Sequence, residues 1–539
     1  MKTSEYCHSA LDAEQHLHII RKLRVKPAMT LKCHFSPFRR QNAVTAIRKD
    51  VKITACFLCL FFFSLSLAGQ DINLEYCIDR ATNHSLQASR VENDFLTGQS
   101  DFFNYKAGRL PSVSLRFNPL QYNSQFTKRY DYNENIDVYR QQQLISSSAG
   151  VSISQGVELT GGRFTLESDL NYMRNFGENL YTQYSSVPVR FGYSQSLFGY
   201  NRLKWEKIIE TLKYEKVKKQ YLYAREAAAE KAISIFFDLA TAQAEYVMAT
   251  DNIASADTLL AHGKEKNRFG IISQADLLTL ELDFISAQNA LEDAITKLDH
   301  ATTAFLSFFD LDNDDNIRIE LPEYLPELTI PVEEAFFQMK ENNPDILYYR
   351  QRELESAQTV EQMKKTGGVD AYISASVGFN QAGNRFVDSY NHPLRQDMVN
   401  VSVSVPIVDW GTRKRRLTSA KNNRNVTIKT IEQDAYNLEQ ELTANISEFN
   451  RQRELTKKSQ TAYRMANEIY DINKQRFIVG KTDANALTLS RNRKDNTQRT
   501  YLSTLNRYWI LYYTIRKITL YDFEKREKLS MQDSVHFLH

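Results

Sequence analysis

Residues 277–305 read LLTLELDFISAQNALEDAITKLDHATTAF, and their pattern decides the architecture of most of the chain. Apolar side chains recur there in two rows with a seven-residue period: Leu277, Phe284, Leu291, Leu298 and Phe305 in one, and Leu280, Ala287, Ala294 and Ala301 three positions later. Two such rows held over four repeats are typical of a coiled coil. The alanines permit close approach of a neighbouring helix. The stretch therefore predicts a long helix with a packed partner.

A weaker version of the pattern occurs in the second half of the chain. One row is formed by Ile428, Ala435, Leu442 and Phe449, with Ile431 and Leu438 three positions later. Farther on, polar residues stand where apolar ones are expected, at Asn492, Asn496 and Thr500. We interpret that face as lining solvent or a pore. A helix of about 60 residues is about 90 Å long and has no compact core, so it must pack against neighbours.

The two halves of the chain align with each other. Residues 86–90 align with 346–350 at an offset of 260, and residues 194–200 with 404–410 at an offset of 210. The smaller offset leaves about 50 additional residues in the first half, at 127–186. There two alternating stretches flank Thr160-Gly161-Gly162, which predicts an additional hairpin, either inside or outside the main sheet.

Each half therefore predicts the order helix, strand, strand, long helix, turn, long helix. The predicted domains are an N-terminal extension and signal peptide (1–69), a first repeat (70–330), a second repeat (331–525) and a C-terminal tail (526–539). Within the extension, the apolar run 53–68 follows three basic residues and ends in Ser66-Leu67-Ala68, the layout of a secretory signal peptide. The alternatives are a single N-terminal membrane anchor and, for the start of translation, Met29 in place of Met1.

Composition excludes several classes of protein. The formal charge is +3 with both signs interspersed, which predicts no nucleic-acid partner. The mean hydropathy of -0.48 is too polar for a bundle of membrane helices. Cleavage would leave Cys77 as the single cysteine, and the histidines are scattered, so we expect no disulfide, no metal site and no cofactor. No phosphate loop or nucleophile elbow is present, and we expect no enzyme.

The strands impose a second demand for assembly. About four principal strands, including SVSLRF (112–117) and YISASVGF (372–379), cannot close a barrel alone. Open edges inside a membrane would leave backbone groups without partners. Abundant Tyr and Phe in these regions fit the aromatic girdles of outer-membrane barrels. The alternative is a soluble β-sandwich with an aromatic core.

Several motifs in this order resemble the TolC family of outer-membrane efflux proteins, over residues of about 70–525. Residues 405–411 (VPIVDWG) precede a basic run and are similar to the family's strand exit; the first copy, 196–202 (SLFGYNR), lacks the proline and the aspartate. Arg268-Phe269-Gly270 and Arg476-Phe477 with Gly480 resemble the turns at the helical tips. In the first copy the Arg-to-Gly spacing is two instead of four, and Lys266 is the candidate for the basic position.

The resemblance implies a mostly helical α+β fold. Long antiparallel coiled-coil hairpins would form an α-barrel, and four strands per chain would form a transmembrane β-barrel that a homotrimer closes with twelve strands. The protein would lie in the outer membrane, in contact with its lipid, with a large periplasmic portion. It would be the exit duct of an efflux or type I secretion system, with a periplasmic adaptor (membrane fusion) protein and an inner-membrane RND or ABC transporter as partners. The alternative is a periplasmic adaptor or coiled-coil scaffold without a channel.

The resemblance also implies two sets of site residues. The tips would dock the adaptor through Arg268, Phe269, Gly270, Ser273, Arg476, Phe477, Gly480, Lys481 and Thr482. Members of the family often place carboxylates just past the second turn, where three chains form a constricting ring. This chain has Asn485 at the nearest aligned position, so the candidates for a pore constriction are Asp276, Asp483 and Asn485.

Overall fold

The computed structural model describes residues 71–132, 134–176, 180–311, 317–479 and 481–531. The predicted signal peptide and most of the tail lie outside these residues. The helices are α2 (Leu74–Asn83), α3 (Leu86–Ala107), α4 (Arg202–Arg268), α5 (Gln274–Phe309), α6 (Val332–Asn342), α7 (Pro344–Lys365), α8 (Thr412–Ile478) and α9 (Ala484–Thr519). The strands are β1 (Asp71–Ile72), β2 (Ser112–Asp131), β3 (Ile136–Gly156), β4 (Arg163–Asn175), β5 (Tyr181–Ser196), β6 (Arg318–Ile319), β7 (Asp370–Gly383), β8 (Leu394–Ser404), β9 (Tyr521–Asp522) and β10 (Glu527–Lys528), and a 3₁₀ turn, η1, spans Val387–Tyr390.

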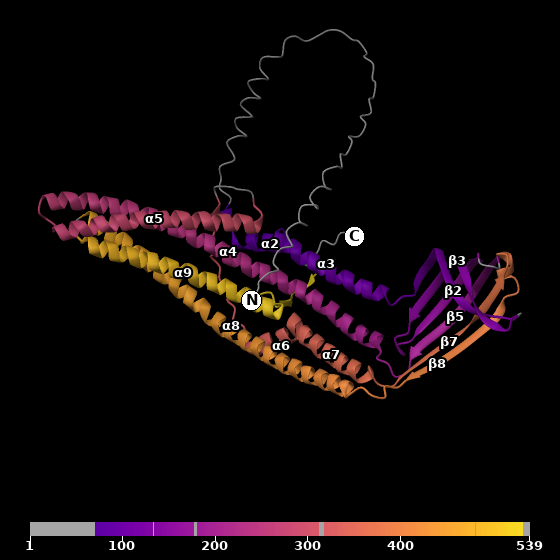
Figure 1. The fold of residues 1–539 in the computed structure, drawn as a ribbon. Helices are drawn as coiled ribbons and strands as arrows, with labels where there is room; N and C mark the ends of the chain where they lie inside the picture. Colours follow the sequence, from indigo (N-terminus) through magenta and orange to yellow (C-terminus); the bar gives the residue numbers. More distant parts are fainter. Residues whose placement is uncertain (1–70, 133, 177–179, 312–316, 480, 532–539) are drawn as a thin grey trace, which may run out of the picture. The chain divides into compact units, whose positions relative to one another are not determined.

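Two long helical hairpins dominate the fold (Figure 1). In the first, α4 of 67 residues is followed by α5 of 36; in the second, α8 and α9 have the same two lengths. Helix α4 packs against α5 and α9, and α9 packs against α8, which gives the packing order α5–α4–α9–α8. Among the described residues, none of the helices combines the length and the apolar character that crossing a membrane requires.

The main apolar core lies where the second hairpin meets the segment between the halves. Phe449 of α8 is fully buried, and its ring stacks on that of Tyr508 of α9, with centroids 5.1 Å apart. The Tyr508 hydroxyl donates a hydrogen bond of 3.1 Å to the carbonyl of Pro326. A second core joins α2, α4, α5 and α9 around Phe236 and Phe305. The seven-residue pattern of each half thus contributes to a buried core, through Phe305 in the first half and Phe449 in the second.

A buried ionic cluster ties the first half of the chain to its C-terminal end. Arg516 of α9 lies 3.0 Å from the carboxylate of Glu226 on α4 and 2.8 Å from that of Asp522. The Tyr512 hydroxyl donates to Asp522 over 2.9 Å. Burial raises the pKa of Glu226, and the positive charge of Arg516 acts in the opposite direction. Since a buried charge needs a partner, the cluster fixes the relative position of α4 and α9.

The two long helices that follow the strands, α4 and α8, begin with different N-terminal caps. In the second half, the Asp409 carboxylate accepts hydrogen bonds from the backbone of Gly411 (2.9 Å) and Arg413 (3.0 Å), which lower the pKa of Asp409. Gly411 has φ +77°, a conformation that favours glycine. The first half lacks this aspartate, and Asn201 caps α4 by accepting from the backbone of Lys204.

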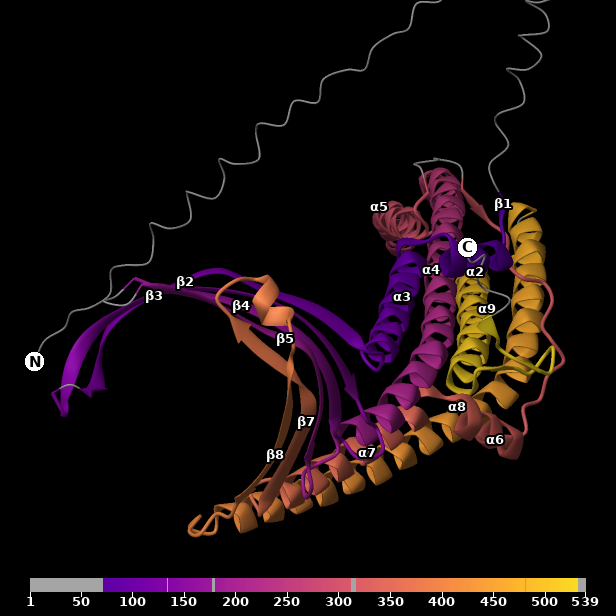
Figure 2. The ribbon, with the colours of Figure 1, turned by 90° about the vertical axis from the view of Figure 1, so that its right-hand side faces the viewer.

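The six long strands form one antiparallel sheet in the order β2–β3–β4–β5–β7–β8, whose curvature Figure 2 shows. The sequence predicted four principal strands and left open whether the additional hairpin joins the main sheet. The four principal strands are present as β2, β5, β7 and β8, and the additional hairpin inserts β3 and β4 between β2 and β5. Pro119 and Pro188 lie at β-bulges, where a missing N–H breaks no ladder bond. Among the described residues of one chain, no strand pairs β2 with β8, so the sheet stays open at both edges.

Candidate functional site

The first helical tip is a complete Schellman turn, in which the backbone closes the end of α4. The N–H of Ile271 donates to the carbonyl of Lys266 (2.9 Å), and the N–H of Gly270 donates to that of Asn267 (2.9 Å). Gly270 has φ +68° and no other atom within 4 Å of where a Cβ would stand. Glycine is therefore required there by backbone conformation and not by lack of space.

The second tip repeats the same hydrogen bond. The N–H of Lys481 donates to the carbonyl of Arg476 over 2.8 Å, as Ile271 does to Lys266. Gly480, which the sequence assigned to this turn, lies outside the described residues. The matching bond makes Lys266 the counterpart of Arg476. Arg268-Phe269 resembles Arg476-Phe477 by sequence, but these two residues lie farther along the turn than the position that Lys266 and Arg476 share.

The predicted docking residues mostly face solvent. Phe269 is 63% exposed, and its ring lies 5.1 Å from the guanidinium of Arg268. The other exposed members are Arg268, Gly270, Ser273, Arg476 and Lys481. Phe477 and Thr482 are half-buried, and Phe477 packs against a small core formed by Leu259, Tyr470 and Leu487, which come from three helices. The two tips thus lie together, and the ammonium of Lys266 lies 5.7 Å from the Phe477 ring.

The candidate constriction residues take unequal positions. Asp276 forms a capping box with Ser273: its carboxylate accepts from the Ser273 hydroxyl (2.7 Å) and backbone N–H (3.0 Å), and both bonds lower the pKa of Asp276. Asp483 is itself the N-cap of α9 and accepts from the backbone of Ala486 over 2.7 Å. Ser273, not Asp276, is therefore the positional counterpart of Asp483. Asn485 is exposed on the first turn of α9.

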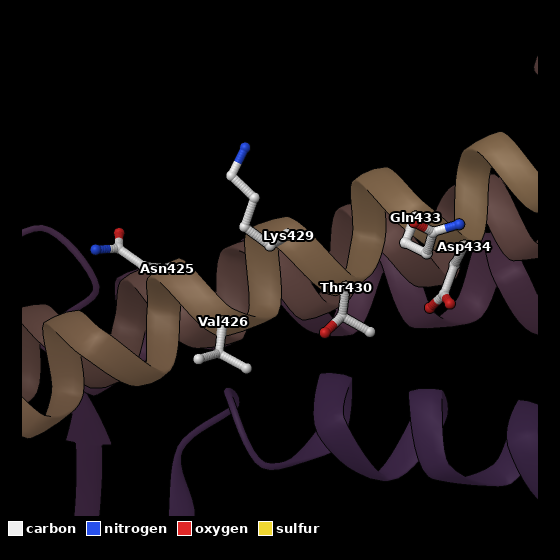
Figure 3. Close-up of a pocket in the computed structure, with 6 residues that line it drawn as sticks. All are labelled: Asn425, Val426, Lys429, Thr430, Gln433 and Asp434. Carbon is white, nitrogen blue, oxygen red and sulfur yellow. The ribbon is translucent and has the colours of Figure 1, made fainter.

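A shallow depression lies on α8, well before its tip. The depression in Figure 3 is lined by side chains of α8 alone, from Asn425 to Asp434, and so is an open flank of one helix. Within the described residues, no three His, Cys, Asp or Glu side chains gather closely enough to hold a metal ion. The arrangement offers charged and aromatic surfaces for contact with other chains.

Comparison with known proteins agrees with this architecture. Residues 337–519, from α6 to the end of α9, match the model of the outer membrane efflux protein family. This match confirms, over that part of the chain, the predicted resemblance to the TolC family. No curated protein matches the chain.

Solved structures show the same fold over most of the chain. The Campylobacter jejuni CmeC outer membrane channel is 14% identical, covers 86% of this chain and 89% of its own, with a TM-score of 0.61. The Vibrio cholerae outer membrane protein VceC is 13% identical, with coverages of 85% and 97% and a TM-score of 0.58. The Neisseria gonorrhoeae MtrE outer membrane channel is 14% identical, with coverages of 85% and 90% and a TM-score of 0.54. The fold of this chain is therefore similar to that of these outer-membrane proteins, two of which are described as channels.

The first tip generates a test of the role of Gly270. Gly270→Ala should destabilise the turn by about 1–2 kcal/mol, because a Cβ disfavours the left-handed conformation. Hydrogen exchange of the Ile271 amide should then accelerate roughly 5- to 30-fold. Gly270→Asn is the control, since asparagine tolerates this conformation, and it should exchange nearly as the parent does. Unchanged exchange in Gly270→Ala would contradict the assigned role.

Proposed function

We propose that this chain is one subunit of a trimeric outer-membrane channel, the exit duct of an efflux or type I secretion system, docked through its helical tips to an adaptor and an inner-membrane RND or ABC transporter. The observation that carries the proposal is the open outer side of α5 and of the tip-side part of α8, which end the packing order α5–α4–α9–α8. Farther from the tip, α8 also packs against α6 and α7. Near the tips, copies of the chain can cover both open sides.

The free edges carry matching apolar stripes close to the tips. On α5, Leu278, Leu282 and Ile285 are 55%, 64% and 53% exposed. On α8, the corresponding stripe is formed by Met465, Ile469 and Ile472, which are 57%, 41% and 55% exposed. Each stripe follows the i, i+4, i+7 spacing of one helix face. Exposed stripes of this kind mark surfaces that pack against another chain.

The stripes lie at similar heights along the helices. Leu278 follows the start of α5 by four residues, and Ile472 precedes the end of α8 by six. Packing of α5 of one copy against α8 of the next would therefore bring the two stripes together. Repeated around an axis, this contact closes the layer into a tunnel of helices. Closed rotational symmetry is the usual outcome for such head-to-tail contacts.

The alternative, an adaptor or coiled-coil scaffold, fits these features less well. An adaptor would normally present one helical hairpin, whereas this chain has two hairpins of equal length. A scaffold has no need of a six-stranded sheet. The match of residues 337–519 to an efflux protein family also favours the channel.

Assembly is tested by charging the two stripes. Leu282→Lys or Ile469→Lys should abolish the heat-modifiable trimer in the outer-membrane fraction, because each places a charge in the proposed contact between copies. The control is Gln288→Lys, an exposed polar residue of α5 beside the stripe. Trimers that persist in both stripe variants would rule out this packing.

Docking is tested at the exposed tips. A photo-reactive phenylalanine analogue in place of Phe269 should cross-link to a periplasmic adaptor, identified by mass spectrometry, and Arg476→Glu should lower the yield on the order of tenfold. Lys458→Glu is the matched control, since Lys458 is exposed on α8 about five turns before Arg476. Equal yields in Arg476→Glu and the parent would remove the tips from the interface.

Asp483, Asp276 and Asn485 are our candidates for the constriction. Three copies would bring three Asp483 carboxylates together, and such a ring attracts cations. Cation conductance should then fall as the pH drops and the carboxylates gain protons. The hydrogen bonds from Ser273 lower the pKa of Asp276, so the Asp276 carboxylate stays charged to lower pH. Asp483→Asn should remove the pH dependence of single-channel conductance, and an unchanged profile would argue against the ring.

A further inference from the structure

The hairpin of β3 and β4 has the same two-sided character as the strands around it. One registered row crosses five strands on a single face, through Val113, Ile153, Leu166, Phe191 and Val377. The neighbouring row on the opposite face consists of Ser112, Ser154, Thr165, Gly192 and Ser376. The apolar and the polar face therefore continue through the inserted strands without a break. This alternation is typical of a wall with lipid on one side and water on the other.

Strands β4 and β5 both carry aromatic residues at two levels of the apolar face. Near the start of β4, the Phe164 ring lies 4.7 Å from that of Tyr193 and 5.5 Å from that of Phe191. Eight residues later, the Tyr172 ring lies 5.2 Å from that of Tyr184. Eight residues of a strand span roughly 27 Å. That length is on the scale of the roughly 25 Å apolar band between the aromatic girdles of outer-membrane barrels.

The polar face of the hairpin carries paired charges. Arg190 of β5 lies 2.6 Å from the carboxylate of Glu167 and 3.7 Å from that of Asp169, both on β4. Charges in a transmembrane strand belong on the water-filled side. The inserted strand therefore supplies carboxylates to the face that would line the lumen.

The turn of the hairpin is also anchored to the helices. The Glu158 carboxylate pairs with Arg109, just after α3, and lies 2.8 Å from the ammonium of Lys207 on α4. These contacts lower the pKa of Glu158, the hydrogen bond from Lys207 most of all. The Asn201 side chain, which caps α4, donates to the Glu158 carbonyl over 2.8 Å. The hairpin is thus tied to the same helix start that its neighbouring strand β5 leads into.

We propose that β3 and β4 are part of the transmembrane wall, so that three copies close a barrel of eighteen strands. The inference rests on the proposed trimer. With six strands alternating in direction, β2 and β8 are antiparallel, and β8 of one copy can pair with β2 of the next. This pairing leaves no open edge in the membrane. Barrel diameter grows nearly linearly with strand number, so the mouth would be about 1.5 times as wide as a twelve-stranded one.

The test compares adjacent residues that face opposite sides of β4. In a Cys77→Ala background, single cysteines replace Leu166 and Thr165 and carry an environment-sensitive fluorophore. The trimer is reconstituted in vesicles of phosphatidylcholine that contain a spin-labelled lipid. The label at Leu166→Cys should lose fluorescence to the spin-labelled lipid, and the label at Thr165→Cys should lose it to aqueous iodide. Val377→Cys and Ser376→Cys on β7 are the matched controls in a principal strand.

The outcomes separate the inference from the proposed function. Iodide quenching of both β4 positions, with lipid quenching at Val377→Cys, would place the hairpin outside the wall and overturn the inference alone. Absence of lipid quenching at Val377→Cys would overturn the barrel itself. Closure is checked by disulfides between Val113→Cys and a scan of Val399, Val401 and Val403 to cysteine. Covalent links between copies are expected, and their absence at every position would exclude the β8–β2 contact.

Discussion

Helices α4 and α9 belong to different halves of the chain, and polar pairs hold them together along much of their length. Asn252 donates to Asp495 over 2.8 Å, Arg499 lies 3.3 Å from Glu245, and Arg516 lies 3.0 Å from Glu226. Asp495 and Glu226 are buried, so removal of their partners Asn252 and Arg516 would leave a buried carboxylate without compensation, whereas Arg499 is exposed. The contact places the two hairpins side by side with α5 and α8 on the outside. Both the assembly surfaces and the joint position of the tips depend on it.

The sequence predicted the elements whose pattern repeats and left open the place of those whose pattern is interrupted. The heptad rows of α5 are buried at Ala287, Ala294 and Phe305, as the seven-residue period indicated. Asn492, Asn496 and Thr500 are exposed, in agreement with a polar face of α9. In contrast, the sequence left open whether the additional hairpin joins the main sheet, and the structure has β3 and β4 within it. The start of β3 contains the run Gln141–Gln142–Gln143, which interrupts the alternation of apolar and polar residues.

The candidate site shows a similar division. The positions of the two tips could be found from the glycines, because a left-handed turn after a long helix favours that residue. The sequence left the pairing of residues between the tips open, because both Arg268 and Lys266 were candidates for the basic position. Arg-Phe occurs in both copies, yet the backbone hydrogen bonds equate Arg476 with Lys266. The capping role of Asp276 was readable in principle, since Ser273 three residues before an acid is a capping box. The docking and gating roles depend on other chains, which one sequence does not contain.

In the proposed barrel, the inserted hairpin would enlarge the wall without rearranging the helices. Strand β2 leaves α3 and β5 leads into α4, so these two strands must run in opposite directions. An insertion of one strand would bring β5 to the wrong end of the sheet and detach α4 from its place. An insertion of two strands restores the direction and adds one turn at the helical end. That turn is the one that Glu158 anchors to Arg109 and Lys207. These ion pairs therefore connect the inserted hairpin to the ends of the two helices, α3 and α4, that flank β2 and β5 in the chain.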